Sequence, residues 1–328
     1  MKRIFFILML IMALVLTACG NPAEEEAEEL IPVKFMLDWV PNTNHTGIFV
    51  AEAEGYFTEE GLDVDIIQPG EVYPEAAVAS GSADFGITFQ EQVTLARADN
   101  VPIVSIAAVI QHNTSGFASA ADLNVSSPAD FEELRYGAWG SPFETPTLEV
   151  LMRCAGADFS KLQMLNTGYA DPLALIVEDQ IDIAWIFYGW QGFQAQQQGV
   201  DINVVMMEDY FNCIPDYYTP VVIANEDTIH NKPQLVRAFM EALSRGYDFA
   251  IDYPEDAADI LLAAVPELDA ELVKSSQNWL SGYYQADAPR WGEQKESVWQ
   301  GYTDWMVEYD ILSAPISADD AFTNEFLP

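Results

Sequence analysis

The chain has 328 residues, of which 50% are hydrophobic and 12% aromatic, so it can form a packed core and suits two lobes better than one. Its formal net charge is -39 at pH 7, which excludes nucleic acid and anionic lipid headgroups as electrostatic partners. We expect most of the 52 acidic residues to form a solvated surface, a feature that favours solubility in salty or alkaline surroundings rather than an activity.

The N-terminus has the pattern of an export signal. A basic start at Lys2 and Arg3 precedes an apolar run over Ile4–Leu16, which is too short for a comfortable membrane span. The run ends in Leu-Thr-Ala-Cys, which resembles a bacterial lipobox, so residues 1–18 are predicted to be a lipoprotein signal peptide with lipid attached to Cys19. An ordinary secretory signal remains the alternative. Residues 19–32 are predicted to form an acidic, disordered tether.

The next segment places polar groups at the end of a predicted strand. Val33–Leu37 is an apolar run of strand length, and Asp38 and Trp39 follow it directly. Asn42 is a good cap for a helix that begins at His45 and runs to 53. Ligands of open α/β sheets bind outside the carboxyl ends of strands, so this junction is a candidate ligand site. A capped turn with an anchoring tryptophan is the alternative.

From this junction onward, strands and helices alternate, which predicts an α/β fold with mostly parallel sheets. The first unit is predicted to have further strands at 64–66, 85–87 and 103–110 and helices at 74–80 and 89–98. The second unit, after 122, is predicted to have strands at 136–138, 163–165, 181–187 and 203–206 and helices at 146–155, 172–179 and 189–198. A strand at 218–224 is expected to cross back, and a helical tail over 232–252, 254–265, 269–281 and 291–309 to wrap the first lobe.

Two further segments follow strands and carry candidate ligand-binding groups. Gln90 and Glu91 come after the strand at 85–87, where an acid also suits the first turn of a helix. Trp139 and Ser141 lie between a strand and a helix, and Glu144 either caps that helix or accepts a hydrogen bond from a ligand.

An aromatic run at 185–190 is a third candidate. Strand alternation places Trp185 and Phe187 on one face, which we expect to be core, while Tyr188 at the strand end is the better candidate for a cleft. Trp190 is a further candidate. Tyr218, with its neighbour at 217, is expected at the crossing between lobes, where it either lines the cleft or packs the hinge.

The sequence gives no pattern for catalysis, a cofactor or a metal. The three histidines form no recognisable triad with a nucleophile, and no glycine-rich phosphate loop follows a strand. Cys154 and Cys213 have no metal-ligand spacing. A disulfide is permitted in an exported chain, but their positions in a predicted helix and a predicted loop lead us to expect two free thiols.

Several motifs together resemble one known family. They are DWVPNTNHTG (38–47), GITFQEQV (86–93), YGAWGSPFE (136–144), DIAWIFYGWQGF (182–193) and DYYTP (216–220). They are similar to the solute-binding lipoproteins of thiamine-precursor ABC transporters, which share a family with the fungal thiamine pyrimidine synthases. The resemblance covers nearly the whole mature chain.

The resemblance implies the fold, the location and the partners. The fold would be the two-lobed type II binding-protein fold, with one lobe from 33–118 and 222–328 and the other from 119–221. The protein would lie on the extracytoplasmic face of the membrane, anchored through Cys19, and would bind an ABC permease with its ATPase. The fungal synthases carry a cysteine-rich motif that has no counterpart in this chain, so we expect a binding protein and not an enzyme.

The implied ligand is a thiamine pyrimidine in its hydroxymethyl or formylaminomethyl form. The Asp38 carboxylate suits the exocyclic amine, Asn42 or Ser141 the ring nitrogens, and Trp39 with Tyr188 would sandwich the ring. The predicted ligand-binding residues are Asp38, Trp39, Asn42, His45, Gln90, Glu91, Trp139, Ser141, Glu144, Tyr188, Trp190 and Tyr218. Riboflavin or another flat heterocycle, a secreted pyrimidine-processing enzyme, and an interaction protein outside transport are the alternatives.

Overall fold

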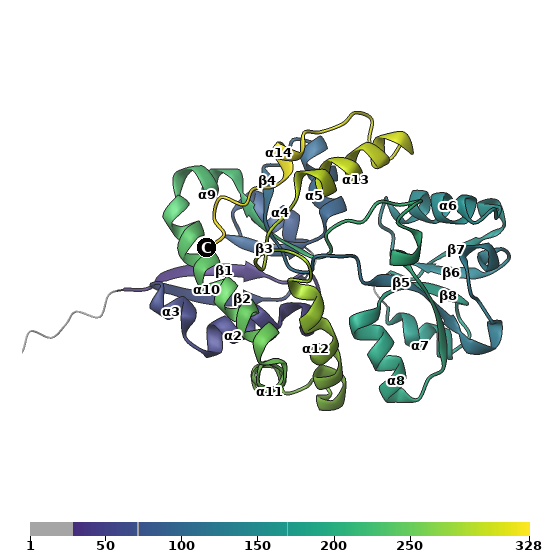
Figure 1. Ribbon diagram of the computed structural model, residues 1–328, viewed down its shortest axis with the longest axis horizontal. Coiled ribbons are helices and arrows are strands. Elements are labelled where there is room, and N and C mark those ends of the chain that lie inside the picture. Colours follow the sequence, from purple (N-terminus) through teal and green to yellow (C-terminus); the bar gives the residue numbers. More distant parts are fainter. Residues whose placement is uncertain (1–28, 71, 169) are drawn as a thin grey trace, which may run out of the picture. The chain divides into compact units, whose positions relative to one another are not determined.

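The computed structural model describes residues 29–70, 72–168 and 170–328, and residues 31–328 form one compact unit (Figure 1). The predicted signal peptide, Cys19 and most of the predicted tether lie outside the described residues. Within the compact unit, the strands form two five-stranded sheets.

The first sheet has the strand order β2-β1-β3-β10-β4. Its strands are β1 (Ile31–Met36), β2 (Leu62–Ile67), β3 (Phe85–Thr88), β4 (Ile103–Ala108) and β10 (Val221–Asn225). β1 pairs in parallel with β2 and β3, whereas β10 is antiparallel to both β3 and β4. The predicted strands of this lobe are therefore confirmed, including the returning strand.

The second sheet has the equivalent order β7-β6-β8-β5-β9. Its strands are β5 (Ser115–Ala120), β6 (Arg135–Ala138), β7 (Gln163–Asn166), β8 (Ile183–Phe187) and β9 (Ile202–Met206). The sequence did not predict β5, because Ser-Gly-Phe-Ala-Ser-Ala lacks β-branched residues. Tertiary pairing with β8 and β9 compensates for the low propensity. The predicted lobe boundary at 118 falls inside this strand.

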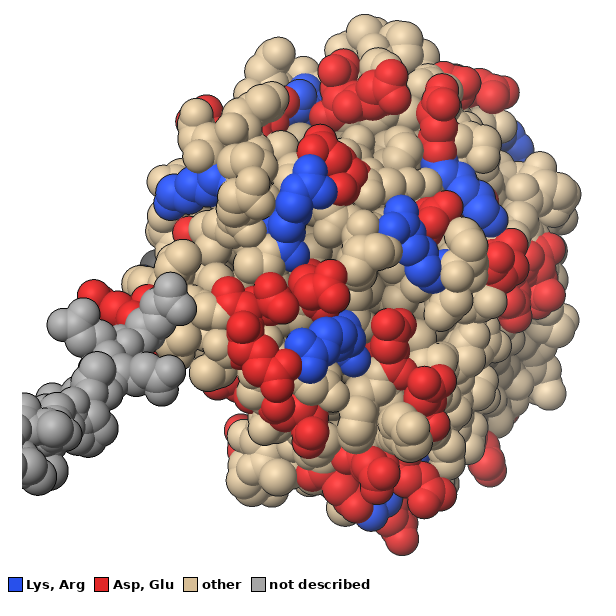
Figure 2. Space-filling model, turned by 60° about the vertical axis from the view of Figure 1, so that its left-hand side comes forward, with Lys and Arg blue, Asp and Glu red and all other residues tan. Residues whose placement is uncertain are grey.

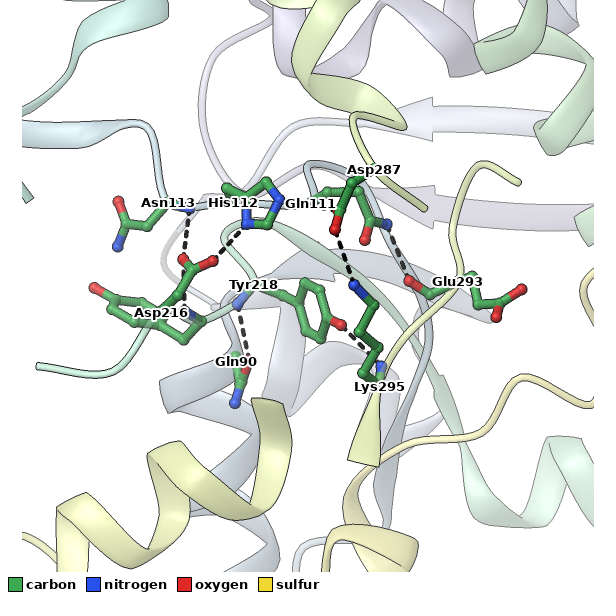
Figure 3. A network of polar contacts seen from close by, with 10 residues as sticks. Gln90, Gln111, His112, Asn113, Asp216, Tyr218, Asp287, Glu293 and Lys295 are labelled. Carbon is green, nitrogen blue, oxygen red and sulfur yellow. Dashed lines mark hydrogen bonds and ion pairs between the residues drawn. The ribbon is translucent and has the colours of Figure 1, made fainter. Parts of the chain in front are cut away.

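Two segments connect the sheets and lie beside each other. The first runs from β4 through His112 to β5, and the second runs through Asp216 to β10. The Asp216 carboxylate binds the first segment twice, at the ring of His112 and at the backbone N–H of Asn113 (Figure 3). In each sheet the antiparallel strand is the one that follows a connecting segment.

Helices cover both sheets. Those of the first lobe are α2 (Thr46–Ala53), α3 (Tyr56–Glu59), α4 (Pro74–Ser80), α5 (Gln90–Ala98), α9 (Glu226–Asn231), α10 (Pro233–Asp252), α11 (Pro254–Ala264), α12 (Ala270–Tyr284), α13 (Glu296–Glu308) and α14 (Ala318–Ala321). Those of the second lobe are α6 (Glu144–Cys154), α7 (Pro172–Val177) and α8 (Phe193–Gln198). Short 3-10 helices lie at Thr43–His45, Ala121–Leu123, Pro128–Phe131, Phe159–Lys161 and Met207–Tyr210, and Tyr188–Gly192 is a π-helix.

Helix α10 forms the centre of the first core. Phe239 stacks on Phe85, with 4.0 Å between ring centroids, and also stacks on Phe35 and Phe57. The same helix packs closely on α2, where a Cβ at Gly246 would lie 2.0 Å from the carbonyl oxygen of Gly47. A glycine at 246 is therefore required for these two backbones to meet.

The helical tail contacts both lobes, so the prediction that it wraps the first lobe is incomplete. Trp279 on α12 packs edge-on against Tyr188, with 5.5 Å between ring centroids. On α13, the Nε1–H of Trp305 donates to the carbonyl oxygen of Cys213 at 3.1 Å. The apolar residues of the tail helices pack into more than one core. The sequence pattern shows which residues are apolar but not which core each one contacts.

The surface is predominantly acidic, as the composition predicts. Figure 2 shows one face on which Asp and Glu side chains cover more of the surface than Lys and Arg side chains. Several cations lie against carboxylates, such as Arg245 with Glu59 at 2.7 Å and Arg237 with Glu325 at 2.6 Å. Exposed pairs of this kind contribute about 0–1 kcal/mol each, so they shape the surface field more than the stability.

Candidate functional site

A cavity of about 400 Å³ lies where the carboxyl ends of strands from both sheets converge. The first lobe contributes residues after β1 and β3, and the second lobe contributes residues after β6 and β7 and residues of β8. Its walls are rich in aromatic side chains, namely Trp39, Tyr73, Phe89, Trp139, Phe143, Trp185, Phe187, Trp190 and Tyr217. This is the position and the lining that a small-ligand site of an α/β fold requires.

The segment after β1 forms one corner of the cavity. Asp38, Trp39 and Asn42 line it, whereas His45 is fully buried behind Asp38. The Nδ1 of His45 accepts from the backbone N–H of Asn42 at 3.2 Å, so its Nε2 carries the proton and donates to Asp38 Oδ1 at 2.6 Å. His45 thus orients Asp38 and does not reach the cavity.

The tail helices hold this corner in place. Tyr247 on α10 donates its hydroxyl to the carbonyl oxygen of Asn44 at 2.7 Å. On α12, Tyr284 donates to the carbonyl oxygen of Thr43 at 2.5 Å, and Ser276 contacts the hydroxyl of Thr43 at 2.5 Å. The turn that carries Asp38 and Asn42 is therefore fixed by packing in addition to its own caps.

The loop after β6 is organised by a buried carboxylate. Glu144 accepts from the backbone N–H groups of Trp139 (3.3 Å), Gly140 (2.8 Å) and Ser141 (2.9 Å), and from the Tyr136 hydroxyl (2.8 Å). Burial raises the pKa of Glu144, while these hydrogen bonds lower it. Trp139 and Ser141 line the cavity, but Glu144 does not; it binds the backbone of the loop before α6, and that helix has no side-chain cap.

The helix after β3 places one carboxyl group at the cavity. Glu91 lines it with only 3% of its surface exposed, and burial raises the pKa of Glu91 to about 8. Gln90 points elsewhere, because its Oε1 accepts from the backbone N–H of Tyr218 at 2.8 Å (Figure 3). The Tyr218 hydroxyl accepts from the backbone N–H of Lys295 at 2.8 Å. Gln90 and Tyr218 therefore pack the second connecting segment and do not line the cavity.

The aromatic run of β8 is placed differently from the prediction. Trp185 and Phe187 line the cavity, and Trp185 is also part of the second core. Tyr188 does not line the cavity, because the strand ends in a π-helix at this residue and its ring turns to Phe193 and Trp279. Phe187, which was expected to be core, therefore lines the cavity, Tyr188 does not, and Trp190 does.

The NMT1/THI5-like family matches residues 42–257, which include most of the cavity wall. The chain belongs to the NMT1/THI5-like family. A formylaminopyrimidine-binding protein of Halalkalibacterium halodurans is 30% identical over 99% of both chains. The riboflavin-binding protein RibY of Chloroflexus aurantiacus is 26% identical over 100% of this chain and 99% of its own. Another relative is named a 4-amino-5-hydroxymethyl-2-methylpyrimidine phosphate synthase of Legionella pneumophila, at 23% identity over 90% of this chain and 92% of its own.

Solved structures share the fold of this NMT1/THI5-like protein. The alkanesulfonate-binding protein SsuA of Xanthomonas axonopodis pv. citri, bound to MOPS, superposes with a TM-score of 0.69 at 14% identity, covering 90% of this chain and 99% of its own. The predicted two-lobed periplasmic binding-protein fold is thereby confirmed. No described helix is both long and apolar enough to cross a membrane.

Sequence reasoning missed several cavity residues of this NMT1/THI5-like chain. Glu75 lies in the first turn of α4, Thr88 ends β3, and Thr219 belongs to the second connecting segment. The Thr88 hydroxyl donates to the Glu75 carboxylate, so these two residues form one polar unit in the wall. Asp38 was predicted because it lies just past a predicted strand. The same rule identifies Thr88 but not Glu75 or Thr219.

The state of Cys154 and Cys213 differs from the prediction. Cys154 and Cys213 form a disulfide, with 6.1 Å between their Cα atoms, and they are not free thiols. The disulfide links the end of α6 to the segment that precedes the second connecting segment. The spacing of the two cysteines in the sequence does not reveal that they lie close together. Within the described residues, no group of three or more His, Cys, Asp or Glu side chains is arranged to hold a metal ion.

Proposed function

We propose that this protein is the substrate-binding component of an ABC importer and binds a thiamine pyrimidine precursor, in the formylaminomethyl or hydroxymethyl form, in the cavity between its lobes. The observation that carries the proposal is the cavity itself, a space of about 400 Å³ with aromatic walls and a carboxylate, Asp38, at one corner. We further propose that the chain is anchored through lipid on Cys19 at the extracytoplasmic face and passes its ligand to a permease with an ATPase.

The wall chemistry suits a flat, amine-bearing ring. Trp39, Trp139 and Trp185 offer aromatic faces and edges, and a favourable aromatic pair contributes about 0.5–1.5 kcal/mol beyond the burial of area. Asp38 accepts from His45 at Oδ1, and its other oxygen retains acceptor capacity for an amine. The formylaminopyrimidine-binding relative, which aligns over almost the whole chain, supports the same ligand class.

Binding rather than catalysis is favoured by what surrounds the cavity. A histidine in this fold could act as a base, but His45 is fully buried behind Asp38, and His112 lies on the connecting segment with its nitrogens bound to carboxylates. Neither imidazole is among the residues that line the cavity. Some relatives are named as synthases, so the test below includes turnover.

Native mass spectrometry tests the ligand directly. We expect the protein, purified in mild detergent without denaturation, to release a compound with the mass of a formylaminomethyl or hydroxymethyl aminopyrimidine. Calorimetric titration of the ligand-free protein with both pyrimidines and with riboflavin should then give binding only to the pyrimidines. Tight binding of riboflavin alone would replace the proposed ligand, and steady multiple-turnover conversion of a pyrimidine would replace the proposed role.

A further inference from the structure

Three residues in the cavity wall each carry a buried polar atom that has no hydrogen-bond partner among the described residues. The atoms are Glu91 Oε2, Ser141 Oγ and Trp185 Nε1. A buried polar group without a partner is unfavourable in a folded protein, so three of them in the wall of one cavity point to groups on a ligand. Glu91 belongs to the first lobe, whereas Ser141 and Trp185 belong to the second.

The first-lobe wall is a cluster of carboxyl groups. Asp38, Glu75 and Glu91 all line the cavity, and they act on one another electrostatically. Burial raises the pKa of Glu91 to about 8, and the charge of Glu75 adds to the rise. This rise favours the protonated form of the Glu91 carboxyl group, which can donate one hydrogen bond through its O–H and accept another at its carbonyl oxygen.

The second-lobe wall offers donors. The indole Nε1–H of Trp185 can only donate, and the Ser141 hydroxyl can donate or accept. The Trp185 ring is fixed by edge-on contacts with Trp139 and Phe143, with centroid distances of 5.4 and 6.0 Å. Glu144 fixes the backbone of Ser141. Both donors are thus held in position before a ligand arrives.

We infer that the pyrimidine is bound with a fixed polarity, in which Glu91 pairs with the ring edge made by the exocyclic amine and its neighbouring nitrogen, and Trp185 and Ser141 bind the oxygen of the ring substituent. The amine carries two hydrogens, so one pairs with Glu91 and the other is available to Asp38. A formamide carbonyl is an acceptor that matches the donor-only indole, so the formylaminomethyl compound fits this assignment. This assignment rests on the proposed function.

Two ligands and three variants test the assignment. The ligands are the formylaminomethyl pyrimidine and 4-amino-2,5-dimethylpyrimidine, which keeps the amine edge but lacks the substituent oxygen. The variants are Glu91→Leu, Glu91→Gln and Trp185→Phe, each measured by calorimetric titration. Thr94→Val on the same helix as Glu91 and Trp305→Phe in the second core serve as controls, because neither residue lines the cavity.

We expect the variants at Glu91 and at Trp185 to change the affinities for the two ligands differently. Glu91→Leu should weaken both ligands by at least tenfold, because the amine edge loses its partner. Glu91→Gln should stay within about threefold of the wild type, because an amide also offers one donor and one acceptor. Trp185→Phe should weaken the formylaminomethyl ligand about tenfold and the dimethyl ligand less than twofold. The two control variants should bind both ligands as the wild type does.

Other results would overturn the assignment. Equal weakening of both ligands by Trp185→Phe would show that the indole acts through packing and not through its N–H. Loss of binding in Glu91→Gln as severe as in Glu91→Leu would show that a charged carboxylate is needed. Failure of the wild-type protein to bind either pyrimidine would instead overturn the proposed function itself.

Discussion

The Nδ1 of His112 lies 2.5 Å from Oδ2 of Asp216, and this contact joins the two segments that connect the sheets. The Nε2 of the same ring lies 3.1 Å from Oδ1 of Asp287, which in turn binds Lys295 at 3.2 Å (Figure 3). The hydrogen bond to Asp216 is the largest cause of a raised pKa of His112. The connecting segments are therefore joined through an imidazole whose charged form is favoured by two neighbouring carboxylates.

This contact predicts a pH-dependent stability. A pKa raised in the folded state contributes stability that is complete below the unfolded value of about 6.5 and is lost as pH rises through the folded pKa. His112→Gln should therefore lower the melting temperature at pH 5.5 and have a smaller effect at pH 8.5. Melting curves across this range check the sign. His230→Gln, at an exposed histidine outside this network, is the control, and an equal loss at both pH values would contradict the prediction.

The Asp38 carboxylate can be tested without destroying its turn. In Asp38→Asn, the amide oxygen can still accept from His45 Nε2, but the NH2 group then faces the ligand amine. We expect affinity for aminopyrimidines to fall about tenfold to a hundredfold, at about 1.4 kcal/mol per decade. Titration calorimetry with apo melting curves checks this. A lower melting temperature with unchanged affinity would mean that Asp38 only fixes the turn.

Glu144 should matter for binding although it does not line the cavity. Glu144→Gln replaces one acceptor oxygen with an NH2 group that meets the backbone N–H groups of Trp139, Gly140 and Ser141. A buried donor without an acceptor costs about 1–3 kcal/mol, so both the melting temperature and the ligand affinity should fall, the latter about tenfold. Glu149→Gln, at an exposed site on the same helix, should change neither property.

The disulfide should contribute to stability and not to ligand binding. Cys154 and Cys213 are 59 residues apart in the chain, and cross-links of this kind typically contribute about 2–4 kcal/mol. The Cys154→Ser/Cys213→Ser variant should unfold at lower denaturant concentration, and a reductant should shift the wild type but not the variant. Neither cysteine lines the cavity, so affinity should be retained. Identical unfolding midpoints in oxidised and reduced wild type would contradict the prediction.

Much of the fold could be predicted because its strands are apolar runs with sharp ends. β1, β3 and β8 were recognisable for this reason, and Pro74 with Gly81 marked the bounds of α4. β5 was not, since its residues carry little strand propensity and its stability comes from two neighbouring strands. Non-local pairing of this kind leaves no periodic trace in a sequence.

Candidate site residues that follow a strand could be predicted from the sequence. Residues whose side-chain direction depends on the local backbone geometry could not. Asp38, Trp39 and Ser141 were found by position alone. β8 ends at Phe187, as predicted, but its alternation does not show which face meets the cavity, so Phe187 was expected to be core although it lines the cavity. Glu75 was missed because it enters the wall from the start of a helix that no polar motif marks.

The position of β10 constrains the order in which the molecule can assemble. This strand pairs with both β3 and β4, yet it begins only at Val221, after every strand of the second sheet has been made. During synthesis from the N-terminus, the first sheet therefore has an open gap between β3 and β4 until the second lobe has emerged. The strands of the second lobe must therefore all be synthesised before the first sheet can close.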